Sequence, residues 1–335
     1  MGEKNPWSDN LLADRAAHRK ATGAKVFAHD DDIRTGRKTA GVHDLLNPYG
    51  VIRECRDSEN HPEPLAGIVI LDVTGSMKRL PGIFVERLKQ LMGLVLRGGY
   101  VDHPQWMFVA VGDATCDRAP LQVGQFEASA EMEDDLGRMY LEGNGGGQKT
   151  ESYELAAYFA ARRTSIDCYE KRGKRGYMFI VGDEMPYGRV KRAEVERLIG
   201  DKIQADIPTE EIFAEAKEKY DIFFILPSMA SYGGDRQVLD TWKTLLDQGH
   251  VLVLDDAEAL PELIAVTIGE YEGSVDADRA VADVRAISGD KAAASVEKAL
   301  ALRDRDNPSS GSIEKVNLDN LPDSPEGDSR SIKRL

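Results

Sequence analysis

The fold is decided by the stretch AGIVILDVTGSM, residues 66–77. Its first half is an unbroken apolar run that ends at Asp72, and its second half sets Thr74 and Ser76 on either side of a glycine. A continuous apolar run is typical of a strand that is covered on both faces, as strands are in a parallel sheet. The stretch therefore predicts a buried parallel strand that ends in a polar turn.

Beyond this strand, apolar runs of strand length alternate with segments of helical periodicity. The expected strands cover residues 106–113, 121–126, 177–183, 221–226 and 251–254, with 121–126 at a sheet edge. The expected helices cover residues 81–97, 132–141, 151–163, 190–199, 209–219, 237–246 and 261–270. Such alternation predicts an α/β fold with a doubly wound, mostly parallel sheet that is flanked by helices.

The composition changes outside residues 65–272, the expected α/β domain. Residues 1–64 are polar and predict a partly ordered N-terminal extension, while the alanine-rich segment 273–305 predicts a helical region. Residues 306–335 hold few apolar side chains, so we expect a disordered tail. Within that tail, residues 313–321 place Ile, Val and Leu among acidic residues, and a docking peptide is the alternative there.

The charge, the cysteines and the lack of long apolar runs exclude several classes of protein. With 43 basic and 58 acidic residues the net charge is −15, which argues against a nucleic-acid binder because phosphate contacts need a basic surface. Three widely spaced cysteines, with no CxxC pair, argue against a zinc knuckle and fit a reducing compartment. No secretory leader and no membrane-spanning apolar run is visible, so we expect a cytoplasmic protein that does not bind a membrane.

Polar residues follow the expected strands at the points where ligands bind to open α/β sheets. Asp72, Thr74 and Ser76 come after the first strand, Thr150 ends a glycine-rich loop, and Asp183 follows a later strand. Carboxylate and hydroxyl oxygens are ligands that suit hard cations such as Mg²⁺. Because hydroxyl ligands are neutral, such a cation would keep an open position for an anionic group.

This arrangement resembles the von Willebrand factor A domain and its metal-ion-dependent adhesion site, whose motif is DxSxS or DxTxS. The resemblance covers about residues 65–272, with Asp72, Thr74, Ser76, Thr150 and Asp183 at the motif positions. It implies Mg²⁺ or Mn²⁺ held by these five residues, and a protein partner that supplies an Asp or Glu to the metal. It implies binding rather than catalysis. Some bacterial members of the family are adaptors that work beside AAA+ ATPases.

The chain departs from the family pattern at three places. The middle position of the first motif is Thr74 rather than the more usual serine, which keeps the hydroxyl. The loop ligand could be Ser152 instead of Thr150. After the later strand, Asp183 is the expected ligand, and Glu184 should point away if the alternation of the strand continues.

Ordinary structural roles compete with each of these assignments. Asp72 and Ser76 could cap the helix that starts near Pro81, and Thr150 could cap the helix that follows it. Asp113, which also follows a strand, is interpreted as a turn residue or a neighbour of the site rather than a ligand.

Two other functions stay open at this point. One is a Mg²⁺-dependent phosphatase or hydrolase, in which a second acid two residues after Asp72 would act as the general acid. Thr74 occupies that place and cannot donate a proton in this way, so the chain is not expected to be an enzyme. The other is a structural assembly protein, in which a metal ion only stabilises the fold.

Overall fold

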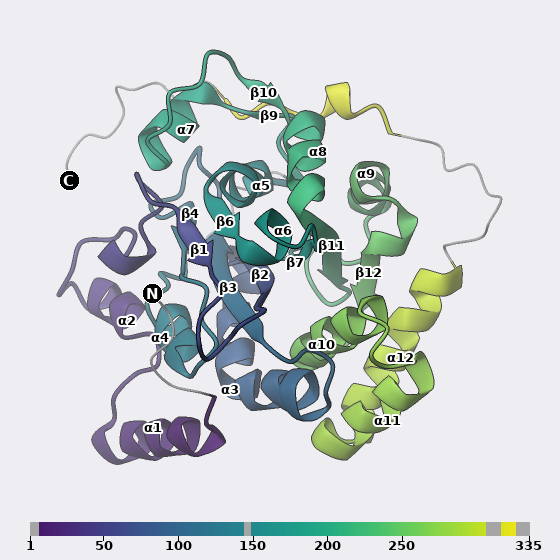
Figure 1. Ribbon diagram of the computed structural model, residues 1–335. Coiled ribbons are helices and arrows are strands. Elements are labelled where there is room, and N and C mark those ends of the chain that lie inside the picture. The colour runs from purple at the N-terminus through teal and green to yellow at the C-terminus, as the bar shows by residue number, and fades with distance from the viewer. Residues whose placement is uncertain (1–6, 144–148, 306–315, 326–335) are drawn as a thin grey trace.

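The computed structural model describes residues 7–143, 149–305 and 316–325, with no account of the side chains of residues 76, 304 and 305 (Figure 1). The strands are β1 Arg53–Cys55, β2 Leu65–Asp72, β3 Pro104–Val111, β4 Leu121–Val123, β5 Thr150–Glu151, β6 Thr164–Ile166, β7 Gly176–Val181, β8 Met185–Pro186, β9 Arg189–Val190, β10 Ile207–Pro208, β11 Tyr220–Pro227 and β12 Val251–Leu254. The helices are α1 Asp9–Thr22, α2 Ala28–Arg34, α3 Leu80–Met92, α4 Glu131–Gly137, α5 Tyr153–Arg162, α6 Asp167–Glu170, α7 Arg192–Leu198, α8 Thr209–Lys219, α9 Arg236–Leu246, α10 Leu260–Tyr271, α11 Ala277–Ser288 and α12 Asp290–Arg305.

A central sheet with the strand order β12-β11-β7-β2-β3-β4 carries the fold. All its neighbouring strands are parallel except β4, which runs antiparallel to β3 at one edge. Every residue of β2 is buried, and Val69 lies opposite Phe108 of β3 on one side and Phe179 of β7 on the other. The predicted fold class is confirmed: the chain is α/β, with a mostly parallel sheet flanked by helices.

The order of the strands creates a switch point between β2 and β7. The chain leaves β2 through α3 to reach β3 on one side, and later returns through α5 to place β7 on the other side. Since such crossovers are right-handed, α3 and α5 cover opposite faces. Helix α10 packs beside α3, and α8 packs beside α5 (Figure 1). Ligands of open α/β sheets bind at such a switch point, beyond the carboxyl ends of the strands.

The helical region near the C-terminus consists of two helices. The alanine-rich pattern predicts one helical segment there, and the chain instead turns at Gly289 between α11 and α12. Both helices pack against the α/β domain, α11 against α10 and α12 against β12. No helix in the described part of the chain is long and apolar enough to cross a membrane.

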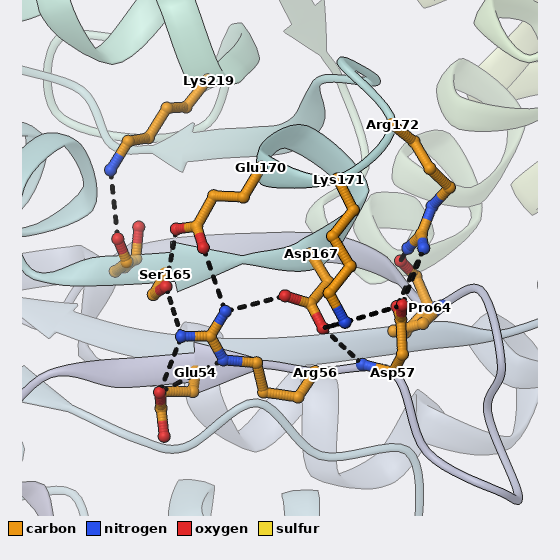
Figure 2. Close-up of polar contacts among 11 residues, drawn as sticks. Glu54, Arg56, Asp57, Pro64, Ser165, Asp167, Glu170, Lys171, Arg172 and Lys219 are labelled. Carbon is orange, nitrogen blue, oxygen red and sulfur yellow. Dashed lines mark hydrogen bonds and ion pairs between the residues drawn. The ribbon is translucent and has the colours of Figure 1, made fainter.

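The N-terminal extension is attached to the domain by a short strand and a charged cluster. Strand β1 pairs in parallel with β6. Just beyond it, the Arg56 guanidinium donates hydrogen bonds to Asp167 at 2.7 Å, to Glu170 at 3.0 Å and to Ser165 at 2.6 Å (Figure 2). Burial raises the pKa of Asp167, but hydrogen bonds from Lys171, the backbone and Arg56 outweigh it and hold that pKa at about 2. The cluster therefore ties the extension to α6.

Part of the expected disordered tail is packed on the domain. The structure describes residues 316–325, and within them Leu321 and Ser324 are buried. For this segment the expectation of a disordered tail is wrong, because its few apolar residues find a surface on the folded domain that composition alone does not reveal. The rest of the expected tail, residues 306–315 and 326–335, lies outside the described residues.

Candidate functional site

Two of the expected ligands lie at the switch point. Asp72 is the last residue of β2, Asp183 lies just beyond the end of β7, and both side chains are buried. They are close enough to interact: burial raises the pKa of Asp72, and the charge of Asp183 raises it further. Strand pairing therefore brings together two carboxylates that are far apart in the sequence.

Three donors surround the carboxylate of Asp72. One oxygen accepts hydrogen bonds from the Thr74 amide at 2.8 Å and from the Thr74 hydroxyl at 2.7 Å. The other oxygen accepts a bond from the Tyr153 hydroxyl at 2.9 Å. A hydroxyl that donates its proton keeps its lone pairs, so Thr74 can still act as a ligand.

Asp72 does not cap a helix. Helix α3 begins at Leu80, and its N-cap residue, Arg79, makes no capping bond with its side chain. The side chain of Ser76, the third expected ligand of the first motif, lies outside the described residues.

A small two-stranded sheet places Thr150 beside the chain that follows β7. Strand β5 pairs in parallel with β8, which sets Thr150 opposite Met185, close in sequence to Asp183. Helix α5 begins at Tyr153 with Ser152 at the N-cap position, so Thr150 is not its cap. The Ser152 hydroxyl accepts a hydrogen bond from the Ala114 amide at 2.9 Å and so holds the turn after β3. Thr150 and Ser152 therefore both stay candidates for the loop ligand.

The carboxylate of Asp183 is anchored to the loop after β11. One oxygen accepts a hydrogen bond from the Tyr232 amide at 3.1 Å. Burial raises the pKa of Asp183, and hydrogen bonds from the backbone of the loop oppose that rise.

Glu184 does not stand apart from the site as the alternation of the strand suggested. Burial and the charges of Asp72 and Asp183 raise the pKa of Glu184 to about 9, so its carboxyl lies within electrostatic reach of theirs. The strand has already ended at Val181, and alternation therefore no longer sets the direction of this side chain.

A second Asp-x-Thr turn follows β3 and repeats the geometry of the first. Asp113 accepts hydrogen bonds from the Thr115 amide at 2.8 Å and hydroxyl at 2.7 Å, and from the Tyr187 hydroxyl at 3.0 Å. From the sequence, Asp113 is interpreted as a turn residue or a neighbour of the site, and neither tyrosine of the two turns is predicted. The repeated Asp-x-Thr spacing was the available signal for Asp113, whereas nothing local marked Tyr153 or Tyr187.

Negative charge accumulates around this edge of the sheet. Burial and the charges of Asp72 and Glu184 raise the pKa of Glu151, which sits beside Thr150. Burial, Glu142 and Asp113 raise the pKa of Asp117 to about 7. Carboxyls that raise one another's pKa in a buried setting are costly to ionise together, and a bound cation would remove that cost.

The donor set fits a hard cation only if hydroxyls take part. Within the described residues, no group of three or more His, Cys, Asp and Glu side chains could hold a metal ion by itself. None of the salt bridges between described residues includes Asp72, Asp183 or Glu184. A site built from Asp72, the Thr74 and Thr150 hydroxyls and a more distant Asp183 agrees with both findings. When bound there, Mg²⁺ would supply an electrophilic position for an anionic ligand.

Comparison with known proteins adds little to this geometry. No protein-family model and no curated protein matches the chain. Among solved structures, it is similar to the pilus adhesin SpaC from Lactobacillus rhamnosus GG in its open conformation, with a TM-score of 0.42 and 10% identity over 71% of this chain. It is also similar to proximal thread matrix protein 1 from the mussel byssus, with a TM-score of 0.36 and 13% identity over 64% of this chain. The chain spans 31% of the adhesin and 48% of the mussel protein, and such likenesses assign neither family nor function.

Proposed function

We propose that the protein is a metal-dependent protein-interaction module, in which Mg²⁺ or Mn²⁺ recruits an Asp or Glu of a partner. The observation that carries the proposal is the buried Asp72 carboxylate, which polarises the Thr74 hydroxyl at the switch point of the sheet. Thr150 and Asp183 lie at the same edge, as in the adhesion site that the first motif resembles. The metal would be held by Asp72, Thr74, Thr150 and Asp183, together with Ser76.

Neutral hydroxyl ligands favour binding of a partner over catalysis. They leave much of the charge of the cation unbalanced, so its open position attracts a carboxylate. The place of a general acid, two residues after Asp72, is taken by Thr74. The net charge of −15 repels an acidic partner at long range, and coordination at short range must overcome that repulsion. The metal is therefore expected to be essential for the complex.

The family resemblance suggests the setting. Bacterial proteins with this motif include adaptors that work beside AAA+ ATPases, and a cytoplasmic adaptor is the role that we propose. Neither nucleic acid nor membrane is expected as a partner.

Calorimetric titration with Mg²⁺ and Mn²⁺ tests the proposal. Asp72→Asn keeps the shape of the side chain but removes its charge, and we expect it to abolish metal binding while the far-ultraviolet circular dichroism stays native. Asp221→Asn is the matched control, because Asp221 lies near the start of β11, at the amino ends of the parallel strands and away from the candidate site. Equal affinity in the native protein and in Asp72→Asn would refute the assignment.

The binding role has its own test. Partner capture by the native protein should be lost in EDTA and return with Mg²⁺ or Mn²⁺, and the Asp72→Asn protein should capture nothing. A partner that binds equally well in EDTA would exclude the metal from the interface. Hydrolysis of an aryl phosphate that depends on Asp72 would show that the protein is an enzyme instead.

A further inference from the structure

Residues 316–325 run beside β9, on the far side of the domain from α3 (Figure 1). The groove in which they lie is lined on the domain side by Gly188, Arg189 and Thr209. The segment begins where the Val316 amide donates a hydrogen bond to the Thr244 hydroxyl of α9, at 3.1 Å. A short 3₁₀ turn, Leu318–Asn320, then packs against α9. Further on, the Pro322 carbonyl accepts a hydrogen bond from the Gly188 amide at 2.9 Å. The segment is therefore bound through its backbone at Val316 and at Pro322.

Apolar and charged side chains add recognition to these backbone contacts. Leu321 is 9% exposed and Ser324 is 2% exposed, so both are inserted into the surface of the domain. Between them, the Asp323 carboxylate lies 3.3 Å from the Lys191 ammonium and 3.9 Å from the Arg189 guanidinium. The groove thus contacts a leucine, an acidic residue and a small polar residue of the segment.

The fit of this segment is incomplete. Ser324 lies beside Glu194, and a hydrogen bond from its hydroxyl opposes the rise in the Glu194 pKa that burial causes, so the defect lies elsewhere along the segment. A cavity of about 210 Å³ remains between Leu318, Leu321 and Thr209. Unfilled space beside a bound segment weakens its binding, because packing contacts are lost. A ligand held in this way can be replaced by another of similar chemistry.

Gly188 makes room for the segment. A Cβ atom at this position would lie 2.8 Å from the Leu321 carbonyl oxygen and 3.3 Å from the Leu321 Cβ. The Gly188 amide is also the donor to Pro322, so the residue serves the segment through both its backbone and its lack of a side chain. Alanine at this position should therefore displace the segment.

We propose that this groove is a docking site for an extended acidic peptide of the type Leu-Pro-Asp-Ser. The chain's own residues 318–324 occupy it in cis, and a partner segment of the same chemistry competes for it in trans. The site is separate from the proposed metal site, and its occupation does not require a metal ion.

Fluorescence anisotropy with a labelled synthetic peptide of residues 316–325 tests the proposal on the full-length chain. Leu321→Asp empties the groove by placing a charge in the apolar contact, and this variant should bind the peptide. The native chain should bind about tenfold or more weakly, because its own segment competes at high effective concentration. Adding Gly188→Ala to Leu321→Asp should abolish binding, and EDTA should change nothing.

Matched controls separate a steric effect at the groove from a general one. Gly41→Ala is the control for Gly188→Ala, since a Cβ at Gly41 meets no atom within 4 Å. A peptide with Asp323→Lys should bind less well than the native peptide. No saturable binding to the Leu321→Asp chain, or equal binding when Gly188→Ala is added, would overturn the proposal.

Hydrogen exchange of the full-length native chain supplies a second measurement. The Gly188 amide should be protected, and Gly188→Ala should speed the exchange of residues 316–325 without unfolding the sheet. A native dimer that Gly188→Ala dissociates would mean that the groove holds the segment of a second copy, which would overturn the cis arrangement.

Discussion

Gly182→Ala should disrupt the hydrogen bonding that holds the candidate site in place, and should do so more than any substitution at an exposed position. Gly182 follows β7 directly, and a Cβ atom there would lie 1.9 Å from the Tyr153 hydroxyl oxygen and 2.7 Å from the Tyr153 Cζ. Carbon and oxygen need more than about 3 Å, so the phenol would have to move by about 1 Å or more. That movement would break its 2.9 Å hydrogen bond to Asp72.

The packing around the Tyr153 ring leaves no space for this movement. It is fully buried, and it meets the ring of Trp242 edge-on at a centroid distance of 5.5 Å and the ring of Phe224 at 6.4 Å. Overpacking a core costs about 1–3 kcal/mol, and losing a hydrogen bond to a charged group costs about 1.5–3 kcal/mol. Together these terms give a loss of about 4 kcal/mol in the free energy of unfolding.

Urea denaturation followed by tryptophan fluorescence measures this loss, and Trp242 reports on the ring directly. Tyr153→Phe alone should cost only the hydrogen bond, about 2 kcal/mol. The double variant Gly182→Ala/Tyr153→Phe lacks the closest contact, so it should lose less than the sum of the two single variants. Gly234→Ala is the control, because a Cβ there meets nothing within 4 Å. Native stability in Gly182→Ala would refute the reasoning.

Three further predictions concern Thr74, Arg56 and Glu127. Thr74→Ser should leave the Mg²⁺ affinity within about threefold of the native value, because the hydroxyl remains. Thr74→Val should lower that affinity about tenfold or more, because one hydroxyl ligand is lost. Equal calorimetric affinities in the native protein and in both variants would exclude Thr74 as a ligand. Arg56→Met should cost about 1–2 kcal/mol of unfolding free energy in urea at neutral pH because Asp167 loses a charged donor, and the exposed Arg279→Met should cost almost nothing. That loss should fade as the pH falls below about 4 towards the Asp167 pKa of about 2, since a protonated Asp167 no longer needs the cation. Burial and the charges of Glu131 and Asp135 raise the pKa of Glu127 from its ordinary value of 4.5 to about 8. Native stability should therefore fall as the pH rises from the ordinary pKa through the raised one. Glu127→Gln should remove this fall and stabilise the protein by about 2 kcal/mol near pH 9, after allowing for partial exposure, and an unchanged pH profile in thermal or urea unfolding would contradict it.

The elements that the sequence predicted well are those with a strong local signal. Residues 209–219 and 251–254 were expected as a helix and a strand, and α8 and β12 have those bounds. The buried run that ends at Asp72 is β2, because an apolar strand can only lie between covered faces. The ends of some helices differ from the predicted ones. The helix expected from residue 151 begins at Tyr153, because Thr150 and Glu151, the two residues before Ser152, form strand β5.

Much of the support of the candidate site could not be predicted. The hydrogen bond between Tyr153 and Asp72 joins residues that are distant in the chain, and so does that between Tyr187 and Asp113. Neither tyrosine has a neighbour in sequence that marks it, because its partner is selected only when the strands pair. The Ser152 hydroxyl, a candidate ligand from its position in the loop, also accepts a hydrogen bond from the distant Ala114 amide, which no local pattern reveals.

The sequence by itself determined the α/β class, the positions of the buried strands along the chain and the residues that follow the strand ends. Burial on both faces and the turn after each strand are local properties of the chain, so the sequence alone reveals them. Only the tertiary structure decided which of those residues meet, with Asp72, Asp183 and Glu184 at one switch point, and where residues 316–325 bind. Those contacts depend on strand pairing and on the shape of assembled surfaces, such as the space that Gly188 leaves for Leu321. Packing of this kind exists only once distant segments have come together, so no local pattern encodes it.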